Sequence, residues 1–240
     1  MTTLEQKSTT EEIRARFDRD VERFSRLDTG QETAMDAPVM LQLLRDLGRA
    51  WLRPGARLLD LGCGAGNFTL ALAQEVNPLD CTLADLSAPM LERARERVSA
   101  VNRGAVATVQ GDMRDLALPQ NHFDLIVTGA ALHHLRDAAD WRRMFTRLAG
   151  WLRPGGILYV SDFISCDDPA VQEVMWARYG RYLESTGGPA LREKVFAYVD
   201  REDSPRSLAF QFETLCACGF AFTEVLHRNA VFAAYYARKA

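Results

Sequence analysis

Long hydrophobic runs are missing from this 240-residue sequence, and so is the hydrophobic segment of a signal peptide. No apolar run approaches the length that spans a bilayer, and the polar stretch Met1–Glu12 has no apolar centre. We therefore expect a cytoplasmic protein that makes no contact with a membrane.

Paired cysteines are also missing, because the five cysteines form an odd set without a repeated spacing. This pattern argues against a disulfide framework. Cys63 and Cys81 are expected to be small buried hydrophobic residues. Cys216 and Cys218 form a C-x-C pair, but no second pair and no spaced pair of histidines accompanies it, so packing is favoured over metal binding. The sequence predicts no metal centre.

The net charge of −3 shows no basic excess of the kind that nucleic-acid binding requires. Basic residues cluster in 93–97 and 141–147, where interleaved apolar residues indicate the solvated faces of helices. With 48% hydrophobic and 25% charged residues, the chain is long enough to bury one large core. We expect a single domain over residues 1–240.

The most informative segment present is Leu58–Thr69, an apolar run that ends in an acid and continues into three alternating glycines. Its pattern predicts a buried strand, a tight turn and then a helix. Gly62, Gly64 and Gly66 allow positive φ angles and let a ligand lie against main chain. A helix that begins near Asn67 directs unpaired N–H groups toward that ligand.

A second apolar stretch, 81–84, ends at Asp85, which lies 25 residues beyond Asp60. In a doubly wound sheet, an acid at this position accepts hydrogen bonds from ribose hydroxyls. The loop differs from the G-x-G-x-x-G pattern of dinucleotide binders, because Asn67 stands where those proteins have a glycine. The sequence therefore favours a nucleoside ligand but not a hydride-transfer enzyme.

Five segments occur here in an order that resembles the class I S-adenosylmethionine-dependent methyltransferases. They are Asp60–Gly66, Asp85, Gly111–Met113, Phe123–Thr128 and Leu152–Leu158. The resemblance implies an α/β, Rossmann-like fold with a seven-stranded, mostly parallel sheet, helices on both faces and strand order 3-2-1-4-5-7-6. It also implies N-terminal lid helices in 1–52, a cofactor-binding core in 55–165, and a helical insertion and terminal β-hairpin in 166–240.

The same resemblance implies S-adenosyl-L-methionine as cofactor, with S-adenosyl-L-homocysteine as product. Gly62 and Gly64 would bring main chain against the methionine part, and Asp60 would support its ammonium group. Asp85 would bind the ribose hydroxyls, and Asp112 the adenine amine. Further contacts with the cofactor are expected from Gly66, Asn67, Leu86, Met90, Met113 and Thr128.

Methyl transfer from a sulfonium requires that the acceptor atom is aligned with the S–CH₃ bond and that water is excluded. Many such sites need no catalytic side chain. His133, in the Leu-His-His-Leu segment 132–135, is our candidate for a general base, although a packing role of this segment is favoured. The Asn/Asp-Pro-Pro-Tyr element of amino-directed methyltransferases is absent. We expect a small-molecule acceptor. The sequence leaves open whether the protein forms a homodimer.

Two alternatives remain open. The layout is also similar to that of carboxy-S-adenosylmethionine synthase, an enzyme of tRNA modification that holds a carboxylate with arginine. Arg192 and Arg201 are the candidates for that task, since arginine binds carboxylates through two parallel hydrogen bonds. A non-catalytic module that binds S-adenosylmethionine is the other alternative. Phe24, on the expected lid segment 17–31, is a further candidate for substrate contact.

Hydrophobic periodicity predicts alternating strands and helices, which is typical of a parallel sheet with right-handed crossovers. We expect helices over 11–28, 37–52, 67–76, 88–101, 139–151, 168–185, 189–200 and 204–217, and strands over 57–61, 81–85, 105–110, 123–128, 156–162, 220–225 and 230–236.

Overall fold

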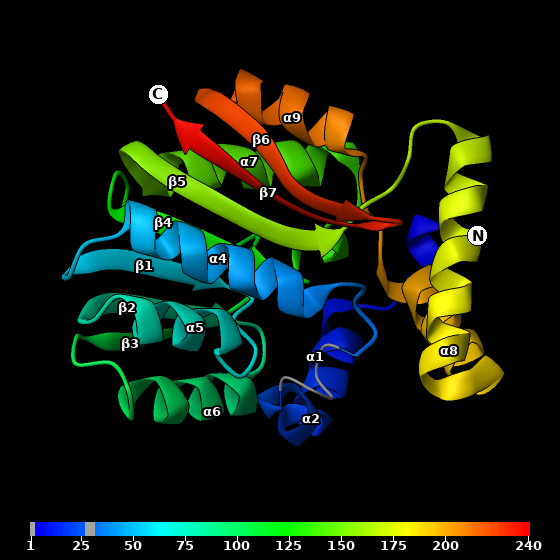
Figure 1. The fold of residues 1–240 in the computed structure, drawn as a ribbon, viewed down its shortest axis with the longest axis horizontal. Coiled ribbons are helices and arrows are strands. Elements are labelled where there is room, and N and C mark those ends of the chain that lie inside the picture. The colour runs from blue at the N-terminus through cyan, green and yellow to red at the C-terminus, as the bar shows by residue number, and fades with distance from the viewer. Residues whose placement is uncertain (1–2, 27–31) are drawn as a thin grey trace.

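The computed structural model describes residues 3–26 and 32–240. Seven strands form one sheet in the order β3-β2-β1-β4-β5-β7-β6, as the sequence predicts (Figure 1). Strands β1 to β5 pair in parallel, and β7 runs antiparallel to both β5 and β6. The strands are β1 (Ala56–Leu61), β2 (Leu79–Asp85), β3 (Val106–Gln110), β4 (Phe123–Gly129), β5 (Leu152–Phe163), β6 (Phe220–Asn229) and β7 (Phe232–Lys239).

Helices cover both faces of the sheet. In Figure 1, α4 and α5 lie in front of it and α7 and α9 behind it, while α8 stands beyond the carboxyl ends of the parallel strands. The helices are α1 (Thr10–Arg19), α2 (Val21–Ser25), α4 (Ala37–Trp51), α5 (Asn67–Glu75), α6 (Ala88–Ser99), α7 (Ala138–Trp151), α8 (Pro169–Glu202) and α9 (Leu208–Ala217), with short 3-10 turns η1 (Leu4–Gln6) and η2 (Leu132–His134).

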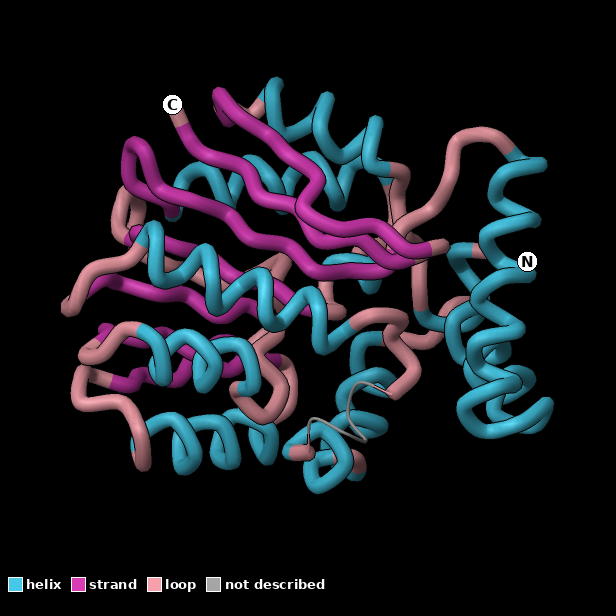
Figure 2. The backbone as a smooth tube through the Cα atoms, viewed as in Figure 1, coloured by secondary structure: helices cyan, strands magenta, loops and turns pink. Residues whose placement is uncertain are grey.

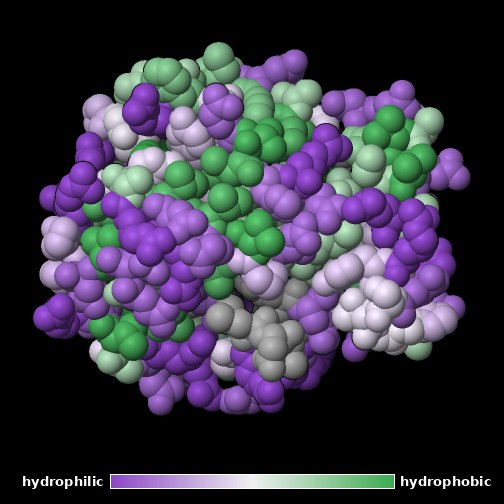
Figure 3. All heavy atoms as spheres, in the orientation of Figure 1, coloured by the Kyte–Doolittle hydropathy of each residue, from purple (hydrophilic) through white to green (hydrophobic). Residues whose placement is uncertain are grey.

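The central strands bury both of their faces, because successive side chains of a strand point in opposite directions. Leu58 packs in the cluster under α4, α5 and α6, whereas Leu59 packs in the cluster under α7 and α9, and both are fully buried. On the outer face drawn in Figure 3, hydrophilic residues predominate around a smaller hydrophobic area. No helix within the described ranges is long and apolar enough to cross a membrane.

Several boundaries differ from the prediction. The expected helix 11–28 breaks at Asp20 into α1 and α2, and its last two residues lie outside the described ranges. The expected helix 204–217 begins only at Leu208, because the Ser207 hydroxyl accepts a hydrogen bond from the N–H of Phe210 and caps the helix there. The predicted break between two helices near Gly188 is confirmed, since Gly187 and Gly188 are non-helical within α8.

The predicted turn at His227–Asn229 is wrong. His227 and Asn229 belong to β6, where they pair with β7, and the chain turns at Ala230 instead. Both side chains reach the Asp36 carboxylate just before α4: His227 Nε2 lies 2.9 Å from it, and Asn229 Nδ2 donates to it at 2.8 Å. This tertiary contact favours an extended conformation over the local turn preference.

The lid helices α1 and α2 lie beside α6, and α1 also contacts the end of α8 through a side chain (Figures 1 and 2). Arg16 of α1 donates both a 3.0 Å and a 3.1 Å hydrogen bond from Nε to the buried Glu202 carboxylate. The N–H of Ser8 donates to the Arg201 carbonyl at 2.9 Å. These contacts hold the N-terminal segment over the carboxyl ends of the strands.

Gly66, at the start of α5, provides a test of how α5 packs against α6. A methyl group on Gly66 would lie 3.2 Å from Ala94 Cβ and Val98 Cγ2 of α6, whereas one on Gly55 would meet nothing within 4 Å, and both residues have positive φ. We expect Gly55→Ala to cost about 1 kcal/mol of unfolding free energy from backbone strain, and Gly66→Ala about 1–2 kcal/mol more from crowding. Urea unfolding of both variants measures the difference, and equal losses would contradict the packing of α5 on α6.

Candidate active site

A cavity opens beyond the carboxyl ends of β1, β2, β4 and β5, between the sheet, the lid helices and α8. Ligand sites of open α/β sheets lie at this edge. Of the predicted cofactor residues, the structure brings to the cavity wall Asp60, Gly62, Gly64, Asn67, Asp85, Leu86, Met90, Asp112 and Met113. Two others lie off this wall: Gly66 packs against α6, and Thr128 is fully buried in β4.

The glycine loop is fixed to the neighbouring strand by main-chain hydrogen bonds. The N–H groups of Gly62 and Cys63 donate to the Ala84 carbonyl of β2, at 2.8 and 3.0 Å. Gly62 and Gly64 have φ angles of 71° and 49°. A methyl group at Gly62 would lie 2.5 Å from Ala131 Cβ, whereas one at Gly64 would enter open space. The main chain at Gly64 therefore borders the cavity.

Asp85 ends β2 and binds the loop directly. Its Oδ2 accepts a 2.8 Å hydrogen bond from the N–H of Gly64, and its Oδ1 accepts a 2.9 Å hydrogen bond from the N–H of Ser87. Burial raises the pKa of this carboxyl above its ordinary value, although the main-chain donors oppose the shift. Asp85 thus fixes the loop and places an acceptor for hydroxyl groups at the cavity wall.

Asp60, at the end of β1, is only 2% exposed. Its Oδ2 accepts hydrogen bonds from Thr69 of α5, 2.7 Å from the hydroxyl and 3.2 Å from the N–H. Burial raises the pKa of this carboxyl to about 7, because these two donors offset only part of the desolvation. A buried acid held near neutrality at a cavity wall is typical of a functional site.

Asp112 has a partner that the sequence did not indicate. Its Oδ1 accepts from the side chain of Arg114 at 2.9 Å, and the Thr10 hydroxyl of α1 lies 3.4 Å from Oδ2. Burial favours a higher pKa for this carboxyl, but the hydrogen bonds from Arg114 outweigh burial and lower the pKa. Asp112 is therefore charged at neutral pH and links the cavity wall to the lid.

Asn67 also connects the loop to the lid. Its Nδ2 donates a 3.0 Å hydrogen bond to the Phe24 carbonyl at the end of α2, and its Oδ1 accepts a 2.9 Å hydrogen bond from Arg97. The Phe24 ring lines the cavity and packs on Phe17, with ring centroids 5.6 Å apart. The amide thus holds one wall of the cavity in place.

His133 lies in η2, directly after β4, and is buried. Its Nδ1 contacts the Asp162 carboxylate at the end of β5, and its Nε2 lies 3.6 Å from Oδ1 of Asp203. Burial lowers the pKa of His133, but Asp203 and Asp162 outweigh it and raise the pKa to about 9. The imidazolium form is favoured at neutral pH, so action as a general base requires that this proton leave first.

Two acids of this cluster were not predicted from the sequence. Asp162 directly follows the β5 core, just as Asp60 and Asp85 end their strands, and this shared position is a signal that could have found it. Asp203 has no such signal, because it follows α8 and reaches the cavity through a 2.7 Å hydrogen bond from the N–H of Ser204 to the His133 carbonyl.

The side of the cavity away from the glycine loop is aromatic, because Phe163 of β5, Tyr179 of α8 and Phe232 of β7 pack on one another with ring centroids 5.1–6.1 Å apart. The aromatic rings on the whole wall are those of Phe17, Phe24, Phe68, Phe163, Tyr179, Tyr198 and Phe232. Of these, only Phe24 was predicted to contact substrate. The other rings could not be selected from the sequence, because aromatic residues at helical spacing usually belong to a core.

The predicted arginines lie elsewhere. Arg192 is 2.8 Å from Glu184 on α8, and 45% of its side chain is exposed. Arg201 is exposed near the end of α8, where its carbonyl accepts from Ser8. Neither is part of the cavity wall within the described ranges. The structure corrects their predicted role in holding a substrate, because α8 turns both side chains outward.

Residues 58–156 match the family described as a methyltransferase domain. An uncharacterized methyltransferase of Mycobacterium tuberculosis is 34% identical over 119 residues, which cover 50% of this chain and 55% of that protein. A carboxy-S-adenosyl-L-methionine synthase of a Shewanella species is 29% identical over 186 residues, covering 76% of this chain and 75% of that enzyme. The chain thus spans about half the length of the first of these relatives.

Solved structures agree on the fold. Human N-acetylserotonin methyltransferase, in complex with S-adenosylmethionine, superimposes with a TM-score of 0.61 at 17% identity, covering 97% of this chain and 57% of that one. The matched domain contains the glycine loop and ends in β5, and the seven strands have the order implied by the resemblance of the motifs. Residues 58–156 are thus similar to methyltransferase domains, and the chain has the fold of methyltransferases of known structure.

Proposed function

We propose that this protein binds S-adenosyl-L-methionine in the cavity and transfers its methyl group to a small-molecule acceptor, leaving S-adenosyl-L-homocysteine. The observation that carries the proposal is the division of one cavity into two chemically different sides. Main chain at Gly64 and the carboxylates of Asp60, Asp85 and Asp112 line the side next to the loop, and the packed aromatic rings from β5, α8 and β7 line the other side.

The residues present fit this cofactor. The open space beside Gly64 is the space that a side chain would fill, and it leaves main chain exposed to a ligand. Asp85 would hold the ribose hydroxyls and Asp60 the ammonium group. When bound, the cofactor supplies an electrophilic sulfonium methyl group. A carboxylate such as Asp85 also attracts a positively charged ligand in a partly buried site.

The remaining residues of the cavity position the acceptor and exclude water. The lid is anchored by Arg16 on Glu202 and by Asn67 on the Phe24 carbonyl, so it closes one side of the cavity. The aromatic side offers apolar surface and ring faces, which suit a flat or largely hydrophobic acceptor. His133, beside these rings, holds a proton that an acceptor oxygen or nitrogen can accept as a hydrogen bond.

Synthesis of a carboxylated cofactor is a second candidate, which the Shewanella relative supports through its coverage of both chains. That chemistry needs an arginine to hold a carboxylate. The four arginines on the described cavity wall, Arg16, Arg23, Arg114 and Arg136, bind a carboxylate or main-chain carbonyls of this protein instead. This observation favours methyl transfer. A non-catalytic binding module is the third candidate.

One experiment separates these candidates. The protein is incubated with methyl-labelled S-adenosylmethionine and a metabolite extract, and the ligand that it carries through purification is identified by mass spectrometry. We expect label in a small molecule and S-adenosylhomocysteine on the protein. A carboxylated cofactor would support the synthase, and a bound cofactor with no transferred label in any extract would support the binding module.

Replacement of Asp85 tests the cofactor site. We expect Asp85→Ala to weaken the binding of S-adenosylhomocysteine by about 1–3 kcal/mol, or roughly 5- to 150-fold in Kd, because the ribose hydroxyls lose a charged acceptor. Isothermal titration calorimetry measures the loss. Asp80→Ala is the matched control, since Asp80 lies on the same strand but is exposed. Unchanged affinity in Asp85→Ala would refute the assignment.

The buried Asp60 carboxyl is expected to lower the stability of the folded protein while it supports cofactor binding. Its pKa is about 7 in the folded protein and near 4 in the unfolded chain, so ionisation weakens the folded state as the pH rises from about 4 to 7. Asp60→Asn removes this loss. We expect the variant to gain about 1–3 kcal/mol of unfolding free energy at pH 8, a smaller gain at pH 5, and weaker cofactor binding.

Urea unfolding at the two pH values, with Asp80→Asn as the exposed control, measures the gain in stability. A loss of stability in Asp60→Asn that is equal at both pH values would show that the carboxylate is not strained by burial.

A further inference from the structure

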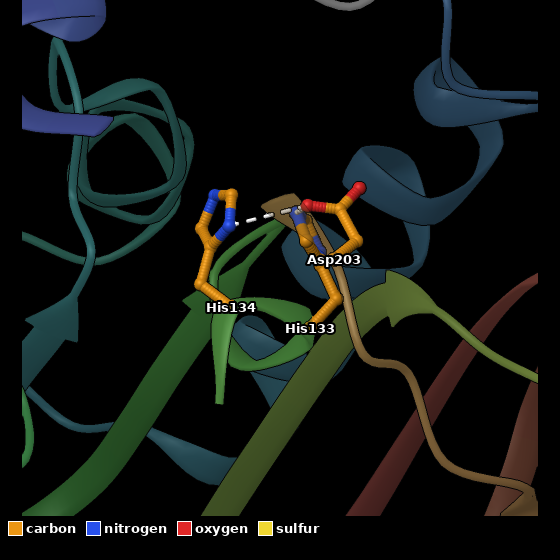
Figure 4. Close-up of side chains that lie close together, drawn as sticks. All are labelled: His133, His134 and Asp203. Atoms are coloured by element: carbon orange, nitrogen blue, oxygen red, sulfur yellow. Dashed lines mark ion pairs between the residues drawn. The ribbon is translucent and has the colours of Figure 1, made fainter. Parts of the chain in front are cut away.

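Three potential metal-ligating residues of the cavity wall lie close together, as Figure 4 shows. They are His133, His134 and Asp203, and one ligand atom of each lies within 4.8 Å of the other two. The histidines come from η2 after β4, and the acid follows α8. We propose that these three residues bind a divalent transition-metal ion, with Asp162 as the residue that orients His133.

The spacing of the three atoms suits a metal ion. Oδ1 of Asp203 lies 3.2 Å from Nδ1 of His134 and 3.6 Å from Nε2 of His133. Tetrahedral nitrogen and oxygen ligands at bonds of about 2.0–2.1 Å are separated from one another by about 3.3–3.4 Å. Small rotations of the side chains reach the required geometry. The ion takes the place of the proton on Nε2 of His133, so hydrogen-bond donation from this nitrogen belongs to the metal-free protein.

The Asp203 carboxylate faces the two histidine nitrogens but forms no well-aligned hydrogen bond with either of them. Asp203 is 7% exposed, yet its Oδ1 has no hydrogen-bond partner of acceptable geometry within the described ranges, and Nδ1 of His134 has none either. A buried carboxylate without a donor is costly. A cation between these two atoms would remove that cost.

His133 is held in the orientation that a metal ligand needs. Its Nδ1 contacts Asp162, whose carboxylate also accepts 2.7 Å hydrogen bonds from the N–H groups of Leu132 and Phe163. The N–H of Ala131 also donates to Asp162, at 3.3 Å, so this carboxylate is fixed and holds the His133 ring with Nε2 directed toward Asp203. In metal sites, a histidine ligand usually donates its other ring N–H to a carboxylate, which fixes the orientation of the ring.

The residues on either side of Asp203, Glu202 and Ser204, are held through their main-chain groups. The Ser204 N–H donates to the His133 carbonyl at 2.7 Å, and a side-chain N–H of Arg136 donates to the Glu202 carbonyl at 2.7 Å. The third ligand is thus fixed to the same segment that carries the two histidines. Asp162 and Asp203 supply two negative charges to the cluster, and the basic groups that also interact with Asp203 are Lys7, Arg16 and Arg136.

The donor set identifies the class of metal. Two imidazoles and one carboxylate suit Zn²⁺, Fe²⁺, Co²⁺ or Ni²⁺, whereas Mg²⁺ and Ca²⁺ prefer oxygen ligands. Because all three residues line the cavity, a further ligand would approach from the acceptor side. An acceptor with an oxygen donor could complete the coordination, a step that rests on the proposed function, whereas metal binding itself does not.

The test is a titration of chelator-treated full-length protein with Co²⁺ and Zn²⁺, without cofactor or acceptor. We expect one ion per chain and, for Co²⁺, visible absorption bands of a low-coordinate nitrogen and oxygen site. Asp203→Asn should weaken binding by at least about 100-fold, and Asp162→Asn, which alters only the second layer, by about 10- to 100-fold. Circular dichroism verifies that both variants are folded.

Two controls make the result specific. His227→Gln alters a histidine that lies 2.9 Å from Asp36, far along the sequence from the cluster, and should leave the affinity unchanged. The Cys216→Ser, Cys218→Ser variant removes the C-x-C pair and should also bind normally. The proposal is overturned if the wild-type protein binds neither ion, if binding disappears with the cysteines, or if Asp203→Asn binds as the wild type does. Calorimetry with S-adenosylhomocysteine on the same chelator-treated protein tests the proposed function separately.

Discussion

The Asp162 carboxylate is the contact on which the arrangement of the cavity depends. It accepts hydrogen bonds from the main chain of Leu132 and Phe163 and contacts the His133 ring, so it fixes the turn after β4 to the end of β5. The His133 carbonyl in turn accepts from Ser204, which places the end of α8 over the sheet. Because this acid is buried, its loss would leave unpaired donors at the centre of the site.

The side of the cavity next to the glycine loop could be predicted from the sequence because it is built locally. Gly62, Gly64 and Asp85 lie in consecutive strand–turn–helix units, where apolar runs mark the strands and their ends meet at one edge of the sheet. The strand order was implied by the resemblance to the methyltransferases, and the structure has that order. The hairpin turn was misplaced, since the contacts of His227 and Asn229 with Asp36 join segments far apart in the sequence.

The acceptor side could not be predicted in the same way. Asp203 approaches His133 only after α8 has folded back over the sheet, and no local pattern marks that approach. The aromatic residues of this side have the spacing of ordinary core residues. Arg192 and Arg201 have the chemistry expected of a carboxylate site, yet the orientation of α8 removes them from the cavity. Chemistry alone therefore selects candidates, and tertiary packing decides among them.

The pairing of Arg16 with Glu202 joins residues that are 186 positions apart. A contact of such separation closes a loop that contains nearly the whole domain, and contacts of this kind form late during folding. During synthesis, α1 emerges before its partner at the end of α8 exists. The sheet edge with the glycine loop can order earlier, so one wall of the cavity can form before its cover.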